Sequence, residues 1–150
     1  MKRITLLLLL FLANHYFGQN SFEKIKNELM KNHPEVLLDN KIIIVNYWSV
    51  NDQSNKEANL ELNKTVTVFE HAKLKGGKKG VIGVIVCSDS NKTGVEVSLN
   101  KGNLLKPYLL GGDFSESVNK NIVYDAEGNI VYKNLSASEL FDSIQQLITR

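Results

Sequence analysis

Few residues in this 150-residue chain could carry out covalent or acid–base chemistry. It contains one cysteine, Cys87, and three histidines, His15, His33 and His71. A lone cysteine cannot form an internal disulfide, and histidines this widely scattered lack the spacing of metal ligands. The sequence also has no nucleophile elbow, phosphate-binding glycine loop or calcium loop. It therefore predicts no catalytic residue, metal or cofactor.

Cys87 directly follows the apolar run of residues 81–86. Such a run is typical of a central strand, where a cysteine behaves as a small buried apolar side chain. The alternative is a reactive thiol, which requires a nearby positive charge or helix N-terminus to stabilise the thiolate. Nothing adjacent in the sequence supplies either one. The pattern favours a structural cysteine.

The strongest pattern along the chain is an apolar strand that leads into a long helix. Residues 41–48 are apolar without polar alternation, which predicts a strand covered on both faces. A helix is expected at about 55–74, begun by a capping box of Ser54 and Glu57 and ended by the glycines at 76–77. Its apolar stripe consists of Ala58, Leu62, Val66, Phe69 and Ala72.

The segments on either side extend this into an alternating α/β pattern. An amphipathic helix is expected at 22–31, before Pro34, and a second apolar strand at 80–87. A strand, a helix and a strand in succession predict a right-handed parallel crossover. Residues 88–102 are predicted to form a short, imperfect helix.

The C-terminal third reads as a hairpin followed by a helix. Residues 104–110 are expected to be extended and to end in a Gly-Gly-Asp turn. Strands at 121–124 and 129–132 are predicted to pair across a short glycine-containing turn. Ser136 and Glu139 form a second capping box, which begins the last helix. The inward face of that helix should consist of Leu140, Phe141, Ile144, Leu147 and Ile148.

This order of elements resembles the thioredoxin superfamily, especially its exported thiol-disulfide oxidoreductase and peroxiredoxin-like branch. Asn46, Tyr47 and Trp48 match the Asn-Phe-Trp strand end, and residues 122–131 are similar to the family's strand-Asp-x-x-Gly-x-Ile hairpin. The resemblance covers about residues 40–150. It implies a three-layer α/β sandwich whose mixed sheet has a central parallel pair, a C-terminal antiparallel hairpin and helices on both faces. A flavodoxin-like sheet, the main rival, would need a parallel crossover in place of the hairpin.

The departures from the family lie at its exchange site. There, one cysteine of a Cys-x-x-Cys motif is stabilised as a thiolate by a helix N-terminus, and the second attacks the mixed disulfide. Asp52 and Asn55 fall at these two positions and can do neither. The family's cis-proline is also missing, because Asn119 occupies that region and a cis bond before a non-proline residue costs about 3 kcal/mol. Residues 46–54 do not match the Pro-x-x-x-Thr-x-x-Cys loop of peroxiredoxins either.

Two functions of different classes follow from the resemblance. The first is a redox-degenerate module that binds a protein or peptide through a cleft lined by Trp48, Asp52, Asn55 and Asn119. The second is a thiol-disulfide oxidoreductase-related enzyme that works through Cys87 alone. A purely structural role for the residues that replace the cysteines is an alternative to the first function. A carboxylate near a helix N-terminus is stabilised by the helix dipole by about 0.3–1 kcal/mol without any ligand.

The chain start predicts export. Two basic residues precede the apolar run 4–13, and a polar stretch with small residues follows, which is the layout of a secretory signal peptide. A run of this length is too short for a bilayer core, which needs about 20 residues. We expect a signal peptide at 1–19, an N-terminal helix and linker at 20–39 and a thioredoxin-like domain at 40–150. The mature protein would be periplasmic or secreted, without stable membrane insertion.

The charge of the chain argues against polyanionic partners. The formal net charge is +2, and Lys2 and Arg3 account for it, so the processed chain would be neutral. A neutral protein has no overall field to attract nucleic acid or an anionic membrane. Four lysines do cluster after the predicted long helix, where cations suit the helix dipole and a solvated loop is expected. They are Lys73, Lys75, Lys78 and Lys79.

Overall fold

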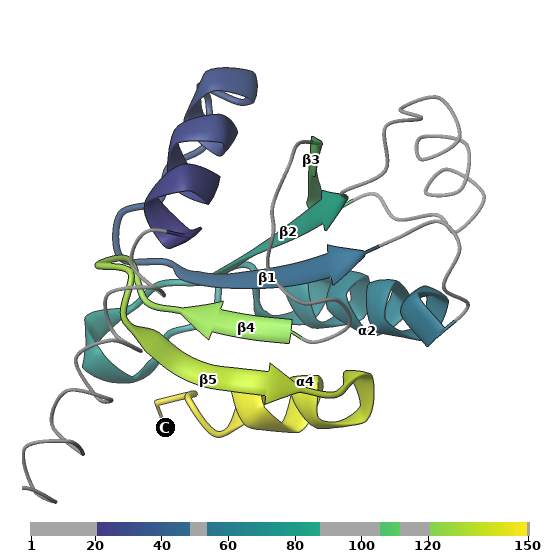
Figure 1. Cartoon of the computed structure of the whole chain (residues 1–150). Helices are drawn as coiled ribbons and strands as arrows, with labels where there is room; N and C mark the ends of the chain where they lie inside the picture. Colours follow the sequence, from purple (N-terminus) through teal and green to yellow (C-terminus); the bar gives the residue numbers. More distant parts are fainter. Residues whose placement is uncertain (1–20, 49–53, 88–105, 112–120, 150) are drawn as a thin grey trace, which may run out of the picture.

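A five-stranded mixed sheet forms the centre of the molecule. The computed structural model describes residues 21–48, 54–87, 106–111 and 121–149, and its strands lie in the order β3-β2-β1-β4-β5 (Figure 1). The strands are β1 (Ile42–Trp48), β2 (Val81–Cys87), β3 (Tyr108–Gly111), β4 (Asn121–Tyr124) and β5 (Ile130–Leu135). The helices are the segment 21–32, α2 (Ser54–Phe69) and α4 (Ala137–Gln145), with a short 3-10 turn, η1 (Lys75–Gly77).

The central strand is β1, which pairs with a neighbour on each side. Its partner β2 is parallel over the whole length of both strands, and β4 is antiparallel. Side chains of β1 alternate between two apolar layers, with Ile43 and Val45 on one face and Ile42 and Ile44 on the other. Because both faces are covered, the strand is apolar without alternation, as the sequence predicted.

Helices cover both faces of the sheet (Figure 1). The helix at 21–32 packs Phe22, Ile25 and Leu29 into one apolar layer, against strand residues of that face. On the other face lie α2 and α4, which contact each other through Phe69 and Phe141, with ring centroids 5.0 Å apart. The predicted three-layer α/β sandwich with a mixed sheet is therefore confirmed.

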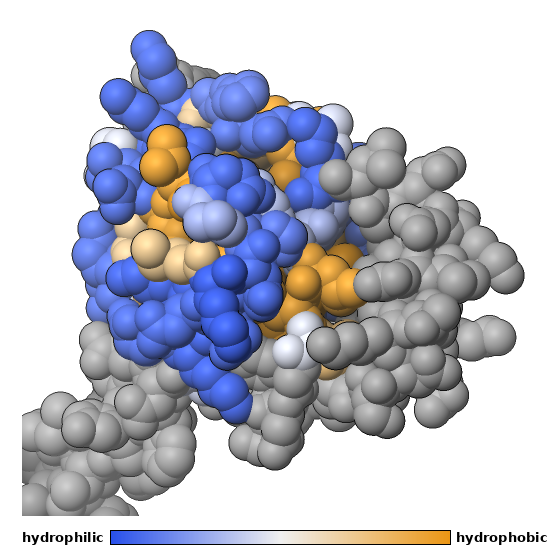
Figure 2. All heavy atoms as spheres, turned by 90° about the horizontal axis from the view of Figure 1, so that it is seen from above, coloured by the Kyte–Doolittle hydropathy of each residue, from blue (hydrophilic) through white to orange (hydrophobic). Residues whose placement is uncertain are grey.

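The layer between β2 and α2 is closely packed. A Cβ atom on Gly83 of β2 would lie 2.6 Å from Cγ2 of Val66, so only glycine lets the helix approach this closely. Leu62, Val66 and Phe69 of the predicted stripe are buried here. Among the residues with described side chains, four large apolar ones are exposed on the outside: Met30, Leu37, Leu60 and Val68. The face shown in Figure 2 is mostly hydrophilic over the described residues, with separate apolar areas.

The long helix is shorter than predicted. The sequence indicated a helix to Leu74, but α2 ends at Phe69. The backbone beyond it forms hydrogen bonds outside the helix. Leu74 N–H donates to the Lys78 carbonyl at 2.9 Å, and Leu74 forms a β-bridge with Ile148 near the C-terminus. Tertiary pairing thus overrides a local pattern that favoured more helix.

The predicted central parallel pair is present, and β3 adds a third parallel strand by pairing with β2. Two further boundaries differ from the predictions. Gly111 belongs to this strand, whereas the sequence placed it in a turn. The second hairpin strand, β5, runs to Leu135, where the sequence predicted an end at Tyr132. The predicted helix at 88–102 lies outside the described residues.

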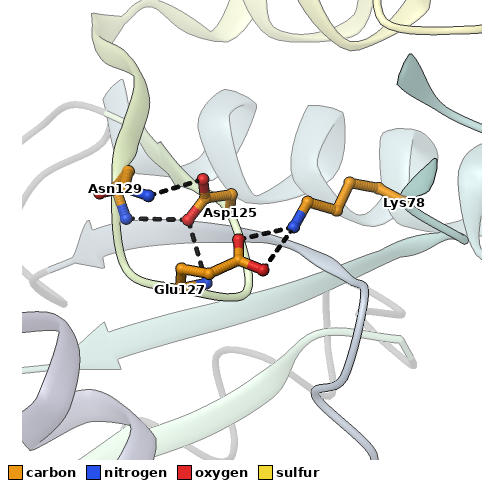
Figure 3. A network of polar contacts seen from close by, with 4 residues as sticks. All are labelled: Lys78, Asp125, Glu127 and Asn129. Atoms are coloured by element: carbon orange, nitrogen blue, oxygen red, sulfur yellow. Dashed lines mark hydrogen bonds and ion pairs between the residues drawn. The ribbon is translucent and has the colours of Figure 1, made fainter. Parts of the chain in front are cut away.

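The hairpin turn between β4 and β5 is held by a side chain (Figure 3). Oδ1 of Asp125 accepts hydrogen bonds from the backbone N–H groups of Glu127 and Asn129, at 3.0 and 2.9 Å, and its Oδ2 accepts one from Nδ2 of Asn129 at 3.0 Å. Glu127 in turn accepts two hydrogen bonds from Nζ of Lys78, which ties the turn to the segment after η1. Partial burial disfavours the charged carboxylate, but these hydrogen bonds and the Lys78 charge prevail and lower the pKa of Asp125.

Asp125→Asn tests this turn and its pH dependence. Since the folded-state pKa lies below the ordinary value of 3.8, the stabilisation is present above that pH and is lost as pH falls through the lowered pKa. We expect the variant to lose about 1–2 kcal/mol at neutral pH, from weakened hydrogen bonds to a charged group. The measurement is urea unfolding between neutral and strongly acidic pH.

The matched control is Asp142→Asn, which changes an exposed carboxylate on α4. Its unfolding midpoint should follow the wild type at every pH. The role given to the turn is wrong if Asp125→Asn shows the same acid dependence and the same neutral stability as the wild type.

Candidate functional site

The parallel strands end at the edge of the sheet to which the family resemblance assigns the exchange site. Trp48 is the last residue of β1 and is in register with Cys87, the last residue of β2. Asn55 lies in the first turn of α2, which begins close behind β1 in sequence. Asp52 and Asn119 lie outside the described residues. The structure therefore describes the elements that carry Trp48 and Asn55, but not the whole of the predicted cleft.

Cys87 is a core residue in this structure. Its exposed fraction is 1%, and it belongs to the apolar layer between the sheet and α2. Ile44, Leu62 and Ile85 are members of the same layer. The predicted burial of this cysteine at the end of a central strand is confirmed. Reagents in solution cannot reach the thiol unless the surrounding layer opens.

A buried pair of asparagines lies at the same end of the sheet, and sequence reasoning did not single it out. Asn46 of β1 and Asn121 of β4 face each other in the ladder and are 0% and 1% exposed. Nδ2 of Asn46 donates to Oδ1 of Asn121 at 3.0 Å, and Nδ2 of Asn121 donates to the Leu135 carbonyl at 3.2 Å. One chain of hydrogen bonds therefore joins β1, β4 and β5. The sequence singled out Asn46 only as part of the matched strand end and as an asparagine in an otherwise apolar strand, and it gave no signal for Asn121 as the partner.

The buried polar groups of the described segments are neutral. Besides the asparagine pair, Asn59 and Thr65 of α2 are 2% and 0% exposed, and no lysine, arginine, histidine or carboxylate there is buried. Oδ1 of Asn46 and of Asn59 and Oγ1 of Thr65 have no hydrogen-bond partner in that part of the chain. Amides and hydroxyls can orient a neighbour, but they are poor general acids or bases at neutral pH. The buried polar groups of the described segments therefore offer hydrogen bonds but no charge.

The two histidines of the described segments lie in different surroundings. The His71 side chain is 88% exposed and lies just beyond the end of α2. His33 is half-buried, with its ring 4.9 Å from that of Tyr108. Among the residues that the structure describes, no three ligating side chains gather to hold a metal ion, and no helix has the length and apolarity to cross a membrane.

Solved structures with a similar fold include domains of thiol-disulfide oxidoreductases. The thioredoxin domain of a thiol-disulfide oxidoreductase from Bacteroides vulgatus matches with a TM-score of 0.60 and 18% identity, over 75% of this chain and 82% of that one. A thiol:disulfide interchange protein from Bacteroides sp. matches with a TM-score of 0.58 and 19% identity, over 72% and 73% of the two chains. A secreted disulfide oxidoreductase of Mycobacterium tuberculosis matches with a TM-score of 0.54 and 16% identity, over 73% and 84%.

These similarities establish the fold. No protein-family model matches the chain, and no curated protein matches it. At identities below one in five the structural matches carry no residue-level assignment. The chain thus has the thioredoxin-like fold of thiol-disulfide oxidoreductases, and with one cysteine it has no Cys-x-x-Cys motif.

The asparagine pair makes a prediction about the stability of this end of the sheet. Asn121→Ala leaves the buried Nδ2 of Asn46 without its acceptor, and an unsatisfied buried group costs about 1–3 kcal/mol. We expect a loss of that size in urea unfolding. Asn32→Ala, which removes an exposed side-chain bond to the Glu28 carbonyl, is the control and should change stability by less than about 0.5 kcal/mol.

A double-mutant cycle distinguishes the pair from two independent polar residues. In Asn46→Val with Asn121→Val both partners are apolar, so no orphaned donor remains and the loss should be smaller than the sum of the single losses. Additive losses would contradict the assignment of a coupled pair.

Proposed function

We propose that this protein is an exported, redox-degenerate thioredoxin-like module that binds a protein or peptide and does not exchange disulfides. The observation that carries the proposal is the position of the only cysteine. Thiol-disulfide exchange proceeds by attack of a thiolate on a disulfide sulfur, and its rate depends on access and on the thiolate fraction. Cys87 is 1% exposed in an apolar layer, which favours neither.

Loss of the second cysteine supports the same proposal. After the first attack, a dithiol enzyme releases its substrate when a second thiol resolves the mixed disulfide. The chain contains no second cysteine, so a mixed disulfide on Cys87 could be resolved only by an external thiol. An enzyme acting through Cys87 alone would therefore need both an opened core and another reductant.

The binding surface we propose is the end of the sheet beyond β1 and β2. Its residues are Trp48, Asp52, Asn55 and Asn119, the positions that match the family's exchange site in sequence. The buried pair of Asn46 and Asn121 would hold β1 and β4 in fixed register beneath it. Because the pair is buried, its role would be to fix the two strands and not to contact the peptide.

Export is part of the proposal. The N-terminal 19 residues have the charge and apolar pattern of a signal peptide. One structural neighbour is itself a secreted disulfide oxidoreductase, which is consistent with an extracytoplasmic role for this fold. The processed chain would begin near residue 19 or 20.

Position-specific photocrosslinking tests this function in the full chain. A benzoylphenylalanine residue is placed at position 52 or 119, and at Lys133 as an exposed control on the outer strand β5, two strands from β1. We expect ultraviolet-dependent polypeptide adducts from 52 and 119 but not from 133, unchanged in a Cys87→Ser background. Mass spectrometry of the adducts also shows where the processed chain begins.

An insulin-reduction assay with dithiothreitol provides the opposing test. We expect the wild type to be as inactive as Cys87→Ser. Reduction above background that Cys87→Ser abolishes would overturn the binding proposal in favour of the single-cysteine enzyme. Equal crosslinking from all three positions, or from none, would contradict the proposed binding surface. An adduct whose chain begins at residue 1 would contradict export.

A further inference from the structure

The lysine-rich segment 73–79 lies at the other end of the molecule from the proposed binding surface. It comes directly before β2, and Ile42 N–H, at the start of β1, donates to the carbonyl of Gly80 at 3.1 Å. The sequence predicted a solvated loop in which these lysines suit the dipole of the preceding helix. Lys73, Lys75 and Lys79 are exposed, as that predicts, but α2 ends at Phe69 and has no basic residue in its last turn, so the helix dipole does not account for them.

Instead, the fold places two of these lysines directly opposite each other. Lys73 and Lys79 form an antiparallel bridge. The flanking hydrogen bonds run from Leu74 N–H to the Lys78 carbonyl, at 2.9 Å, and from Gly80 N–H to the Ala72 carbonyl, at 2.8 Å. A pair between two such bonds is the non-hydrogen-bonded type, whose side chains lie on one face at the shorter spacing. Like charges in this arrangement are destabilising.

No direct ion pair relieves this repulsion in the described part of the chain. Lys73, Lys75 and Lys79 are exposed, and none of the ion pairs found there includes them. Two carboxylates on neighbouring elements are already engaged. Glu127 accepts hydrogen bonds from Lys78, and Glu70 accepts one from Lys106 at 2.7 Å, which lowers the pKa of Glu70.

The backbone under these lysines is held by two other segments, the C-terminal segment 147–149 and the segment before β1. Lys75 N–H donates to the Leu147 carbonyl at 2.7 Å, Lys79 N–H to the Asn40 carbonyl at 2.7 Å, and Thr149 N–H to the Lys73 carbonyl at 3.1 Å. Between the lysines, η1 turns through Gly76 and Gly77, beside which an added Cβ would meet no atom within 4 Å. Three amines are thus presented from a fixed backbone beside open space.

We propose that Lys73, Lys75 and Lys79, here called the basic turn, bind a phosphate-type anionic group. A neutral net charge does not oppose this, because exposed charges at physiological ionic strength act over only about 8 Å. The group could be the headgroup of an anionic membrane or a free phosphate, and the contact is peripheral, without insertion. The proposal is independent of the peptide-binding surface, which lies at the opposite end of β1.

Two titrations separate the two sources of phosphate. Amide chemical shifts of residues 73–79 are followed as inorganic phosphate is added to the protein as purified from its host. In parallel, the protein is sedimented with vesicles of phosphatidylcholine alone or mixed with phosphatidylglycerol, at low and physiological salt. We expect shifts confined to the basic turn, or sedimentation with the anionic vesicles only.

The test variant is Lys73→Gln with Lys79→Gln, and the charge-matched control is Lys31→Gln with Lys133→Gln, two exposed lysines elsewhere. A lysine next to an anionic surface contributes about fivefold to binding, so the test variant should bind anionic vesicles about 30-fold more weakly. The control should bind as the wild type does. Because the change removes a repulsion, the test variant should be at least as stable as the wild type in urea, which excludes unfolding as the cause.

Each outcome decides the proposal. Phosphate-induced shifts without vesicle binding support a free phosphate as the ligand, and vesicle binding lost only in the test variant supports a headgroup. An equal loss in the control variant would show unspecific charge attraction and overturn the basic turn as a site. Absence of both responses in the wild type would overturn it as well.

Discussion

The burial of β1 on both faces is the constraint on which the rest of the structure depends. Six successive residues, 42–47, are buried, and the strand pairs with β2 on one side and β4 on the other. A strand of this kind is stable only if helices cover both of its faces, since at roughly 25 cal/mol per Å² its apolar surface dominates the local free energy. The helix at 21–32 covers one face, and α2 and α4 cover the other.

The same burial limits the chemistry available near Cys87. A thiolate needs a compensating charge or dipole, and the described groups packed around this end of the sheet are apolar side chains and neutral amides. In place of charge, the fold has the hydrogen-bonded chain from Asn46 through Asn121 to Leu135. Hydrogen-bonded pairs of this kind specify strand register, so a structural role accounts for them without catalysis.

Much of the fold was predictable because its signals are local. The strands β1 and β2 follow from uninterrupted apolar runs, the hairpin from its glycine turn, and the start of α4 from Ser136 and Glu139, whose carboxylate accepts a hydrogen bond from Ser136 N–H at 2.9 Å. The end of α2 was not predictable, because it is set by pairing with the C-terminal segment near Ile148. The partner of Asn46 lies 75 residues away, and no local pattern reports such a contact.

The rate at which Ellman's reagent modifies Cys87, measured against urea concentration below the unfolding transition, tests the central claim most directly. If the thiol is a core residue of a scaffold without exchange chemistry, modification requires unfolding of the sheet. The rate should then be very low in water and rise with urea with the same dependence as global unfolding. Rapid modification in water that does not change with urea would show an accessible thiol and contradict the account.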